Sequence, residues 1–377
     1  MPSHLTWATF AETFNLIYLV MKTILTSLAL SLTLAANATI FTVSNNPTVP
    51  AQYSDIQAAH NVAEAGDTLQ LVGSLNSYNL TLSKRLHIIG PGWGTPPGMP
   101  ANMYTTTFNA GSAGSIMEGV QISAYAIINA ANITIKDSYV YQLNLSTSST
   151  NLLVRNCVGL RNIYDIGSAG GQMFSNCLFN YVDNVDSSQP HAYLDGNNSA
   201  MAYPTLFTNC TFYKIYMYEL YNVQFSNCVM HSFQELYPGY NNDYNNCPGC
   251  SINNSMLFCS GCAFTDIGGG VTLADNLNNG ANPFINAPQT LNAYANNTIP
   301  FNQLNFSLVA SSQGINAGTD GTTIGIQGGA YPFAEGSIYG SLSGQVPYVS
   351  SFIINNPVIP QGGTLDIQAT GIIPANQ

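Results

Sequence analysis

The sequence predicts an all-β solenoid, because one short motif recurs along the middle of the chain. The motif reads apolar, any residue, Asn, Cys, any residue, apolar, and a repeat near 20 residues returns each side chain to the same place in successive coils. Six copies lie between Ile133 and Ile267, and the last is degenerate. Their Cys-equivalent residues, at intervals of 19, 20, 33, 18 and 34, are Ser138, Cys157, Cys177, Cys210, Cys228 and Cys262. Each long interval is either one coil with an insertion or two coils with one unreadable copy.

Composition is the second observation. The 377 residues are 46% hydrophobic but only 7% charged, against about 25% in an average soluble protein. The formal net charge is -11 with seven Lys and Arg residues, so the chain cannot build the basic face that nucleic-acid binding requires. An acidic, charge-poor surface is compatible with solubility, with cation binding or with a neutral glycan partner.

The start of the chain has the pattern of a signal peptide. Met21-Lys22 gives a basic n-region, Ile24 to Leu34 an apolar h-region, and Ala36-Asn37-Ala38 a small-residue cleavage site. The mature chain is therefore expected to begin near Thr39 and to be secreted or to lie at the cell surface. No membrane span is expected after cleavage, because no later segment is long and apolar enough.

Residues 1–20 then form an upstream extension. In the alternative interpretation, Leu16–Val20 joins the h-region and makes an uncleaved membrane anchor. Lys22 interrupts that apolar run, which favours cleavage.

A short helix is expected next, between two strands at Thr39–Val43 and Thr68–Val72. Ser54-Asp55 offers an N-cap, and apolar residues at 56, 59, 62 and 63 share one face of a helix over Ile56–Ala65. Gly66 stops this helix before the second strand.

This opening resembles that of secreted bacterial right-handed parallel β-helix proteins of the pectin-lyase-like superfamily. The resemblance lies in Tyr53–Ala59, Ala65–Leu69, Asn79–Leu82 and Leu86–Gly90. Near the other end, Ser311–Gly321 and Ile324–Gly329 resemble the closing coils of that family. The resemblance implies a right-handed parallel β-helix whose first coil is capped by the helix.

Four regions follow from these features. They are residues 1–38 (extension and signal peptide), 39–72 (cap and first strand), 73–335 (β-helix) and 336–377 (connector and C-terminal β segment). In the last region, Tyr348–Ile354 and Thr364–Ala369 read as two strands, expected either to cap the last coil or to belong to a surface-anchoring module.

The motif predicts how each coil is built. Asn tolerates left-handed backbone angles, so it suits a tight bend, and its amide can bond the amide one rung away. The Cys and the residue two later are expected inside. Columns of side chains should then form at about 4.8 Å spacing. One column holds the Cys-equivalent residues, a second holds Phe174, Phe207 and Phe225, and a third holds Phe179, Phe212, Met230 and Phe264.

Cysteines 157, 177, 210 and 228 are predicted to be buried free thiols. Neighbouring parallel strands point their Cβ atoms the same way, which is a poor geometry for bridging. Cys247, Cys250, Cys259 and Cys262 form a CxxC…CxxC pattern instead. Disulfides, unpaired thiols and a tetrahedral zinc site are the three readings of this pattern.

Asp183, Asp186, His191 and Asp195 form the richest ionisable stretch, in the first long interval. Such acids can serve as acid and base in glycan hydrolysis or bind Ca²⁺ in a lyase, and the alternative is a solvated loop. The stretch does not match the carboxylate motifs of polygalacturonases, and no set of calcium-binding acids with a catalytic Arg or Lys accompanies it.

Tyrosines are dense beyond residue 212. Those proposed to bind a ligand are Tyr213, Tyr216, Tyr218, Tyr237 and Tyr240. Aromatic faces along a solenoid can stack sugars or contact proteins, whereas the alternative is that they pack inside or screen a charge-poor surface.

The expected function is that of a secreted, non-catalytic surface, adhesion or structural protein, with an extracellular glycan or cell-surface molecule as candidate partner. The alternative is a polysaccharide lyase or glycoside hydrolase that uses the acids of residues 183–195. No cofactor is expected, except Ca²⁺ if the protein is a lyase. Self-association is compatible with a low-charge solenoid.

Overall fold

The computed structural model describes residues 21–22, 38–92, 100–166, 169–179, 192–196, 204–213, 215–218, 220–231, 247–258, 271–279, 281–287, 305–333, 348–354 and 367–372. The chain divides into two units, Met1–Thr39 and Ile40–Gln377, and the boundary falls where the mature chain is expected to begin. Most of the signal-peptide region lies outside the described residues, so cleavage stays a prediction. Among the helices that the structure describes, none combines the length and the apolar character needed to cross a membrane.

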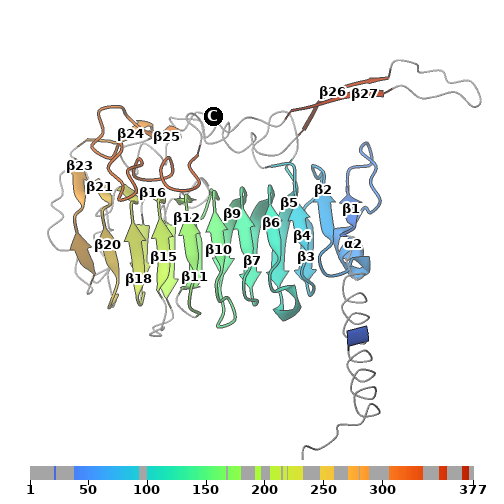
Figure 1. Ribbon diagram of the computed structural model, residues 1–377, viewed down its shortest axis with the longest axis horizontal. Coiled ribbons are helices and arrows are strands. Elements are labelled where there is room, and N and C mark those ends of the chain that lie inside the picture. Colours follow the sequence, from blue (N-terminus) through green and yellow to red (C-terminus); the bar gives the residue numbers. More distant parts are fainter. Residues whose placement is uncertain are drawn as a thin grey trace, which may run out of the picture. The chain divides into compact units, whose positions relative to one another are not determined.

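The second unit is a right-handed parallel β-helix, as the sequence predicts, and Figure 1 shows its strands side by side. An eleven-stranded parallel sheet contains, in spatial order, β1 (Ile40–Val43), β2 (Thr68–Leu71), β4 (His87–Ile89), β6 (Ile116–Glu118), β8 (Thr134–Lys136), β10 (Leu153–Arg155), β12 (Met173–Ser175), β15 (Thr205–Thr208), β18 (Val223–Ser226), β20 (Ser251–Asn253) and β22 (Thr272–Ala274).

Two further parallel sheets complete the coils. A seven-stranded sheet contains β3 (Tyr78–Leu82), β5 (Asn102–Phe108), β7 (Gln121–Ile128), β9 (Tyr139–Asn144), β11 (Asn162–Ile166), β14 (Ala192–Gly196) and β17 (Ile215–Tyr218). A five-stranded sheet contains β13 (Leu178–Phe179), β16 (Thr211–Tyr213), β19 (Val229–His231), β21 (Met256–Phe258) and β23 (Leu277–Asn279). Ala110–Ser112 forms a 3₁₀ turn after β5.

Two antiparallel pairs follow the coils. Strand β24 (Phe284–Asn286) pairs with β25 (Asn305–Leu308), and β26 (Tyr348–Ile354) pairs with β27 (Ile367–Ile372). The second pair confirms the short C-terminal β segment, while its role as a cap stays a prediction.

The predicted capping helix is α2 (Ile56–Val62), three residues shorter than expected. The side chain of Asp55 accepts a hydrogen bond from the Ala58 N–H (2.7 Å), which satisfies one free donor of the first turn. At the other end, Lys84 Nζ donates to the carbonyls of His60, Asn61 and Ala63 at 3.1, 2.9 and 2.7 Å. A cation there satisfies the last carbonyls and complements the helix dipole.

The Asn of the motif is the left-handed corner of each coil, as predicted. It follows each strand of the eleven-stranded sheet from β8 onward, and φ lies between 48° and 54° at Asp137, Asn156, Asn176, Asn209, Asn227, Asn254 and Asp275. A second left-handed corner precedes these strands and was not predicted. Its residues are Gly114, Asn132, Asn151, Gly171, Asn222 and Gly249, with φ between 51° and 80°.

The strand register resolves the two long intervals. Met173 pairs directly with Leu206, so the first long interval is one coil with an insertion. In the second, Gln224 pairs with Ser251 and Ser251 with Thr272, so a further coil intervenes. In this coil Ser255 stands in the Cys position, as Ser138 does in the first copy.

The Cys column therefore continues from Cys228 to Ser255, whose hydroxyl accepts from the Cys228 N–H at 3.0 Å, and not to Cys262. Leu257 pairs with Met230 in the place predicted for Phe264. These two assignments were wrong because the last apparent copy of the motif is not the next rung. Cys262 and Phe264 themselves lie outside the described residues.

Stacked aromatic rings fill the middle of the β-helix. Phe174 and Phe207 stack at 4.6 Å between centroids, and Phe207 and Phe225 at 4.9 Å. Phe179 and Phe212 stack at 4.4 Å in the neighbouring column. All five rings are fully buried. The predicted columns are thus confirmed for these residues.

The four cysteines of the column are free and fully buried, as predicted. Each thiol lies 3.3–3.6 Å from two backbone carbonyls, and one of these belongs to the last residue of the strand before the corner. Burial raises the pKa of Cys157 and Cys210, so these thiols stay protonated. They act as small apolar residues with a weak donor.

Residues 312–333, called here the return segment, do not form the closing coils that the sequence predicts. They contain no strand, and they run across the rungs from late coils to earlier ones. Gly314 lies against Met256, Thr319 bonds Asn227, and Tyr331 reaches Asn156. The resemblance to closing coils was misleading because the segment lies outside the coils rather than continuing them.

The corner amides hold the return segment. Asn176 Nδ2 donates to the carbonyls of Ile326 (3.1 Å) and Gly328 (2.6 Å). Asn156 Nδ2 donates to the Tyr331 carbonyl at 2.6 Å, and Asn227 Nδ2 to Thr319 Oγ1 at 3.0 Å. The expected ladder of amides at this corner is therefore wrong. An amide ladder occurs instead at the second corner, where Asn151 Nδ2 donates to Asn132 Oδ1 at 3.1 Å.

An apolar layer also lies beneath the return segment. The residue after each motif Cys points out of its coil, yet it is fully buried at Val158, Leu178 and Val229. These side chains form a second core with residues that follow the last coil. They are Phe284, Ala287, Phe306, Leu308, Ile324, Ile326 and Phe333. The outer face of the five-stranded sheet is therefore internal.

Replacing Asn176 with Gly should destabilise the protein by about 1–3 kcal/mol, because it removes both donations to the return segment and the bond from Ser175 Oγ, and it leaves the buried Gly328 carbonyl without a donor. The Ile326 carbonyl keeps the Phe333 N–H as a donor. Gly keeps the left-handed backbone accessible, so the loss reports on the amide alone. The measurement is chemical denaturation followed by circular dichroism.

Asn254→Gly is the matched control, because Asn254 occupies the same corner (φ 48°) without a side-chain bond to the return segment. Equal losses of unfolding free energy in the two variants would contradict the conclusion that the Asn176 amide stabilises the protein by binding the return segment.

Candidate functional site

The outer face of the seven-stranded sheet carries tyrosines and amides on successive rungs. We call this set the tyrosine–amide face. It comprises Tyr104, Tyr125, Tyr141, Gln142, Asn144, Asn162, Tyr164 and Tyr193. Tyr104 and Tyr125 are 54% and 40% exposed, and the other six are half-buried. Exposed aromatic rings on a regular strand are suited to contact a ligand rather than to fill a core.

Strand alternation places these side chains outside. In β7, Ile122, Ala124, Ala126 and Ile128 are buried, so Tyr125 between them points to solvent. The register then aligns one column along the solenoid. Its members, in rung order, are Thr105, Tyr125, Gln142, Asn162 and Tyr193.

Contacts between neighbours hold this face in place. Gln142 Nε2 donates to Asn144 Oδ1 at 2.7 Å, and Asn162 Nδ2 donates to Gln142 Oε1 at 3.4 Å. The rings of Tyr164 and Tyr193 lie 5.7 Å apart in a tilted contact. Side chains fixed in this way lose little entropy when a ligand binds.

Arg161 contacts Tyr141 of this face. Its guanidinium donates to the Tyr141 hydroxyl and lies 5.5 Å from the ring centroid. The cation–π contact and the hydrogen bond fix the ring orientation.

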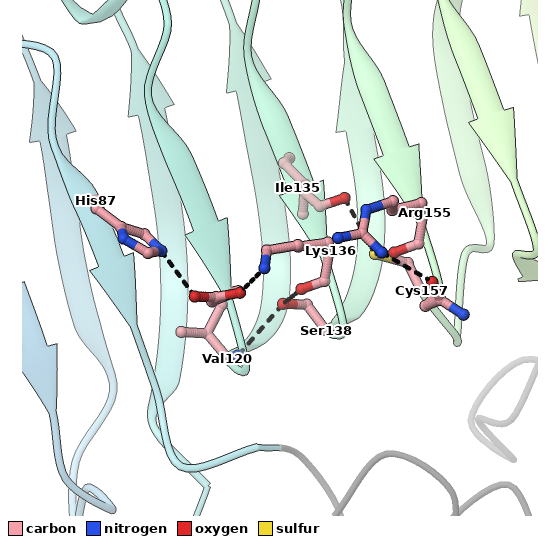
Figure 2. A network of polar contacts seen from close by, with 9 residues as sticks. His87, Val120, Ile135, Lys136, Ser138, Arg155 and Cys157 are labelled. Carbon is pink, nitrogen blue, oxygen red and sulfur yellow. Dashed lines mark hydrogen bonds and ion pairs between the residues drawn. The ribbon is translucent and has the colours of Figure 1, made fainter. Parts of the chain in front are cut away.

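A second polar cluster lies on the eleven-stranded sheet, where Figure 2 shows its contacts. Glu118 accepts from His87 Nε2 at 2.7 Å and pairs with Lys136 on the next rung. Burial acts to raise the pKa of Glu118, but the hydrogen bonds from His87 and Lys136 outweigh it and lower that pKa to about 2. Glu118 is therefore ionised and fully engaged at neutral pH.

Arg155 links this cluster to the return segment. Its guanidinium donates to Asn156 Oδ1 at 3.4 Å and lies 4.4 Å from the centroid of the Tyr331 ring. Since Asn156 also donates to the Tyr331 carbonyl, three residues join the sheet face to the segment.

Asp137 occupies the corner position that five other rungs give to Asn and the β22 rung gives to Asp275. Its side chain is buried, 7% exposed, and Oδ1 has no hydrogen-bond partner. Burial raises the pKa of Asp137 to about 6, although the charges of Arg155 and Lys136 act in the opposite direction. A carboxylate without partners at such a site is costly at neutral pH.

Of the four residues predicted from the acidic stretch, only Asp195 lies among the described residues. Asp195 lies half-buried in β14, two residues from Tyr193. Burial raises the pKa of Tyr164, and the nearby charge of Asp195 adds to this effect. Asp183, Asp186 and His191 lie outside the described residues, so their role stays a prediction.

The predicted binding tyrosines are described in part. Tyr213 ends β16, and in β17 Tyr216 pairs in register with Tyr193 and Tyr218 with Asp195. Tyr237 and Tyr240 lie outside the described residues.

The sequence analysis missed the tyrosines of earlier rungs, which the seven-stranded sheet aligns. A detectable signal was present, because residues 121–128 and 139–144 alternate between apolar residues and other residues, among them Tyr125, Tyr139 and Tyr141.

Cys247 and Cys250 are buried and free, whereas Cys259 and Cys262 lie outside the described residues. Within the part of the chain that the structure describes, no three His, Cys, Asp or Glu residues cluster as metal ligands. The four-thiol zinc site therefore stays untested.

Comparisons of the chain with protein-family models, with curated proteins and with solved structures found no match. The fold class rests on the structure itself, and the superfamily resemblance rests on the motifs alone.

Asp137→Asn should stabilise the protein by about 1–3 kcal/mol at pH 8, because a shift of one pKa unit corresponds to about 1.4 kcal/mol. The folded pKa of about 6 lies above the ordinary value of 3.8, so the carboxylate penalises the folded state above pH 6. The advantage of the variant should shrink as the pH falls through 6 toward 4. Denaturation midpoints across this range measure it.

Asp275→Asn serves as the control, since Asp275 occupies the same corner (φ 54°) but is exposed. A gain for Asp137→Asn that does not depend on pH would contradict the assignment to the buried carboxylate.

Proposed function

We propose that this protein is a secreted β-helix protein that binds a neutral extracellular polysaccharide along the tyrosine–amide face, without cleaving it. The single observation that supports the proposal most is the column of tyrosines and amides on consecutive rungs of the seven-stranded sheet. The superfamily resemblance is consistent with a carbohydrate ligand, and the signal-peptide pattern is consistent with an extracellular one.

The chemistry of the face suits sugars. Tyrosine rings present flat apolar surfaces to the C–H faces of sugar rings, while Gln and Asn donate to and accept from hydroxyl groups. Rungs repeat about every 4.8 Å, comparable to the length that one sugar adds to an extended chain. A linear polysaccharide lying along the solenoid axis would therefore meet equivalent groups rung after rung.

The charge distribution favours an uncharged ligand. Among the described residues of this face the cation is Arg161, which is committed to Tyr141. The nearest acids, Asp165 and Asp195, would repel an anionic polysaccharide.

The proposal of a non-catalytic role rests on the surroundings of Glu118 and Asp137, two carboxyl groups whose pKa departs from the ordinary value. Glu118 is bound by His87 and Lys136, and Asp137 is buried at a coil corner. Both lie on or beside the eleven-stranded sheet and not on the tyrosine–amide face. The alternative function, a lyase or hydrolase using Asp183, Asp186, His191 and Asp195, with Ca²⁺ in the case of a lyase, is distinguished by turnover.

A panel of neutral and acidic polysaccharides, tested by affinity electrophoresis, should reveal retardation by neutral polymers. Tyr125→Ala and Tyr164→Ala should each weaken binding about tenfold, equivalent to about 1.4 kcal/mol. Tyr331→Ala is the control, because this exposed tyrosine lies on the return segment and not on the face. Binding should persist in high salt, since no ion pair carries it.

Equal loss in Tyr331→Ala and Tyr125→Ala, or retention only by acidic polymers, would contradict this location of the site. Release of reducing ends or unsaturated sugars that disappears in Asp183→Ala or Asp186→Ala would instead establish the enzymatic alternative. The assay should be run with and without Ca²⁺.

A further inference from the structure

We propose that Cys247 and Cys250 form a reversible dithiol–disulfide pair, which small disulfides such as oxidised glutathione convert to an internal disulfide. The proposal is independent of glycan binding. It concerns a motif, Cys247-Pro248-Gly249-Cys250, that the proposed function does not use.

The turn brings the two cysteines together. The Cys250 N–H donates to the Cys247 carbonyl at 3.2 Å, and Gly249 has φ 73°. Pro at the second position and Gly with positive φ at the third define a type II turn, whose end Cα atoms lie within about 7 Å. This separation overlaps the range that a disulfide spans, about 4.4–6.8 Å.

The two thiols also influence each other. The neighbouring Cys250 thiol lowers the pKa of Cys247, and Cys247 raises the pKa of Cys250, while the Cys250 thiol donates to the Leu220 carbonyl at 3.5 Å. The Val223 N–H points at Cys250 Sγ at 3.5 Å. Cys247 is therefore the better nucleophile, and Cys250 lies where a resolving thiol is needed.

Accessibility separates this pair from the cysteine column. Pro248 and Gly249 are exposed, so opening of one surface turn uncovers both sulfurs. Cys157, Cys177, Cys210 and Cys228 lie inside the coils between paired rungs, and reaching them requires the coil itself to unfold. Local opening of a turn costs far less than unfolding a core element.

The reaction balances as a thiol–disulfide exchange. The Cys247 thiolate attacks one sulfur of oxidised glutathione, the glutathione S–S bond breaks, and one glutathione leaves. The Cys250 thiolate then attacks the Cys247 sulfur and displaces the second glutathione. Both protons from the protein thiols end on the two reduced glutathiones, while the protein gains one disulfide.

The folded full-length chain is incubated with oxidised glutathione, quenched with acid, denatured and alkylated, and its cysteine peptides are identified by mass spectrometry. The peptide holding Cys247 and Cys250 should be unalkylated and two hydrogen masses lighter, and reduced glutathione should reverse the change. Peptides of the column should stay alkylated. In the native state, direct alkylation of the pair should outpace that of the column by at least about tenfold.

Cys250→Ser should accumulate a mixed disulfide between Cys247 and glutathione, because the resolving thiol is gone. Cys228→Ser is the control and should still close the internal bridge. Linkage of Cys247 or Cys250 to Cys259 or Cys262, persistence of both thiols, or oxidation of the column at the same rate would each overturn the proposal. Mass-spectrometric mapping of the cysteine peptides in the unsubstituted chain decides among these outcomes even if a variant fails to fold.

Discussion

The left-handed corner is the constraint on which the rest of this structure depends. From β8 onward, each short strand of the eleven-stranded sheet turns sharply at its end, and a residue with positive φ makes that turn. Among residues with a side chain, Asn and Asp accept this conformation at the lowest cost. Because the corner recurs at each rung, the strands stay in register, and their inward side chains fall into columns of Phe and Cys.

The same corner has a second consequence that Gly could not provide. The amides of Asn156, Asn176 and Asn227 point out of the coils and bind the backbone of the return segment. They replace the hydrogen bonds that irregular backbone would otherwise make to water. Beneath them, Val158, Leu178 and Val229 give the five-stranded sheet an apolar outer face, which the same segment covers. Asp137, at the next corner, lacks such a partner and carries a raised pKa.

The three sheets thus have different outer faces. The outer face of the five-stranded sheet is buried, the eleven-stranded sheet carries the polar cluster of His87, Glu118 and Lys136, and the seven-stranded sheet carries tyrosines and amides. With so few charges in the chain, exposed tyrosine and amide groups are the chemistry left for recognition. This distribution is why the proposed ligand is an uncharged polymer and why the proposed contact runs along the axis.

Local sequence by itself determined the capping helix, the Asn corner, the Phe columns and the free buried thiols, because each follows from neighbouring residues and a repeat of fixed length. It also contained the alternation that places Tyr125 outside. The tertiary structure alone decided the partners of distant segments: that Ser255 follows Cys228, and that the return segment binds corner amides up to 175 positions away. Periodicity reports which face a residue occupies, but not which non-periodic segment packs on that face, because such contacts depend on shape and on unmet hydrogen bonds.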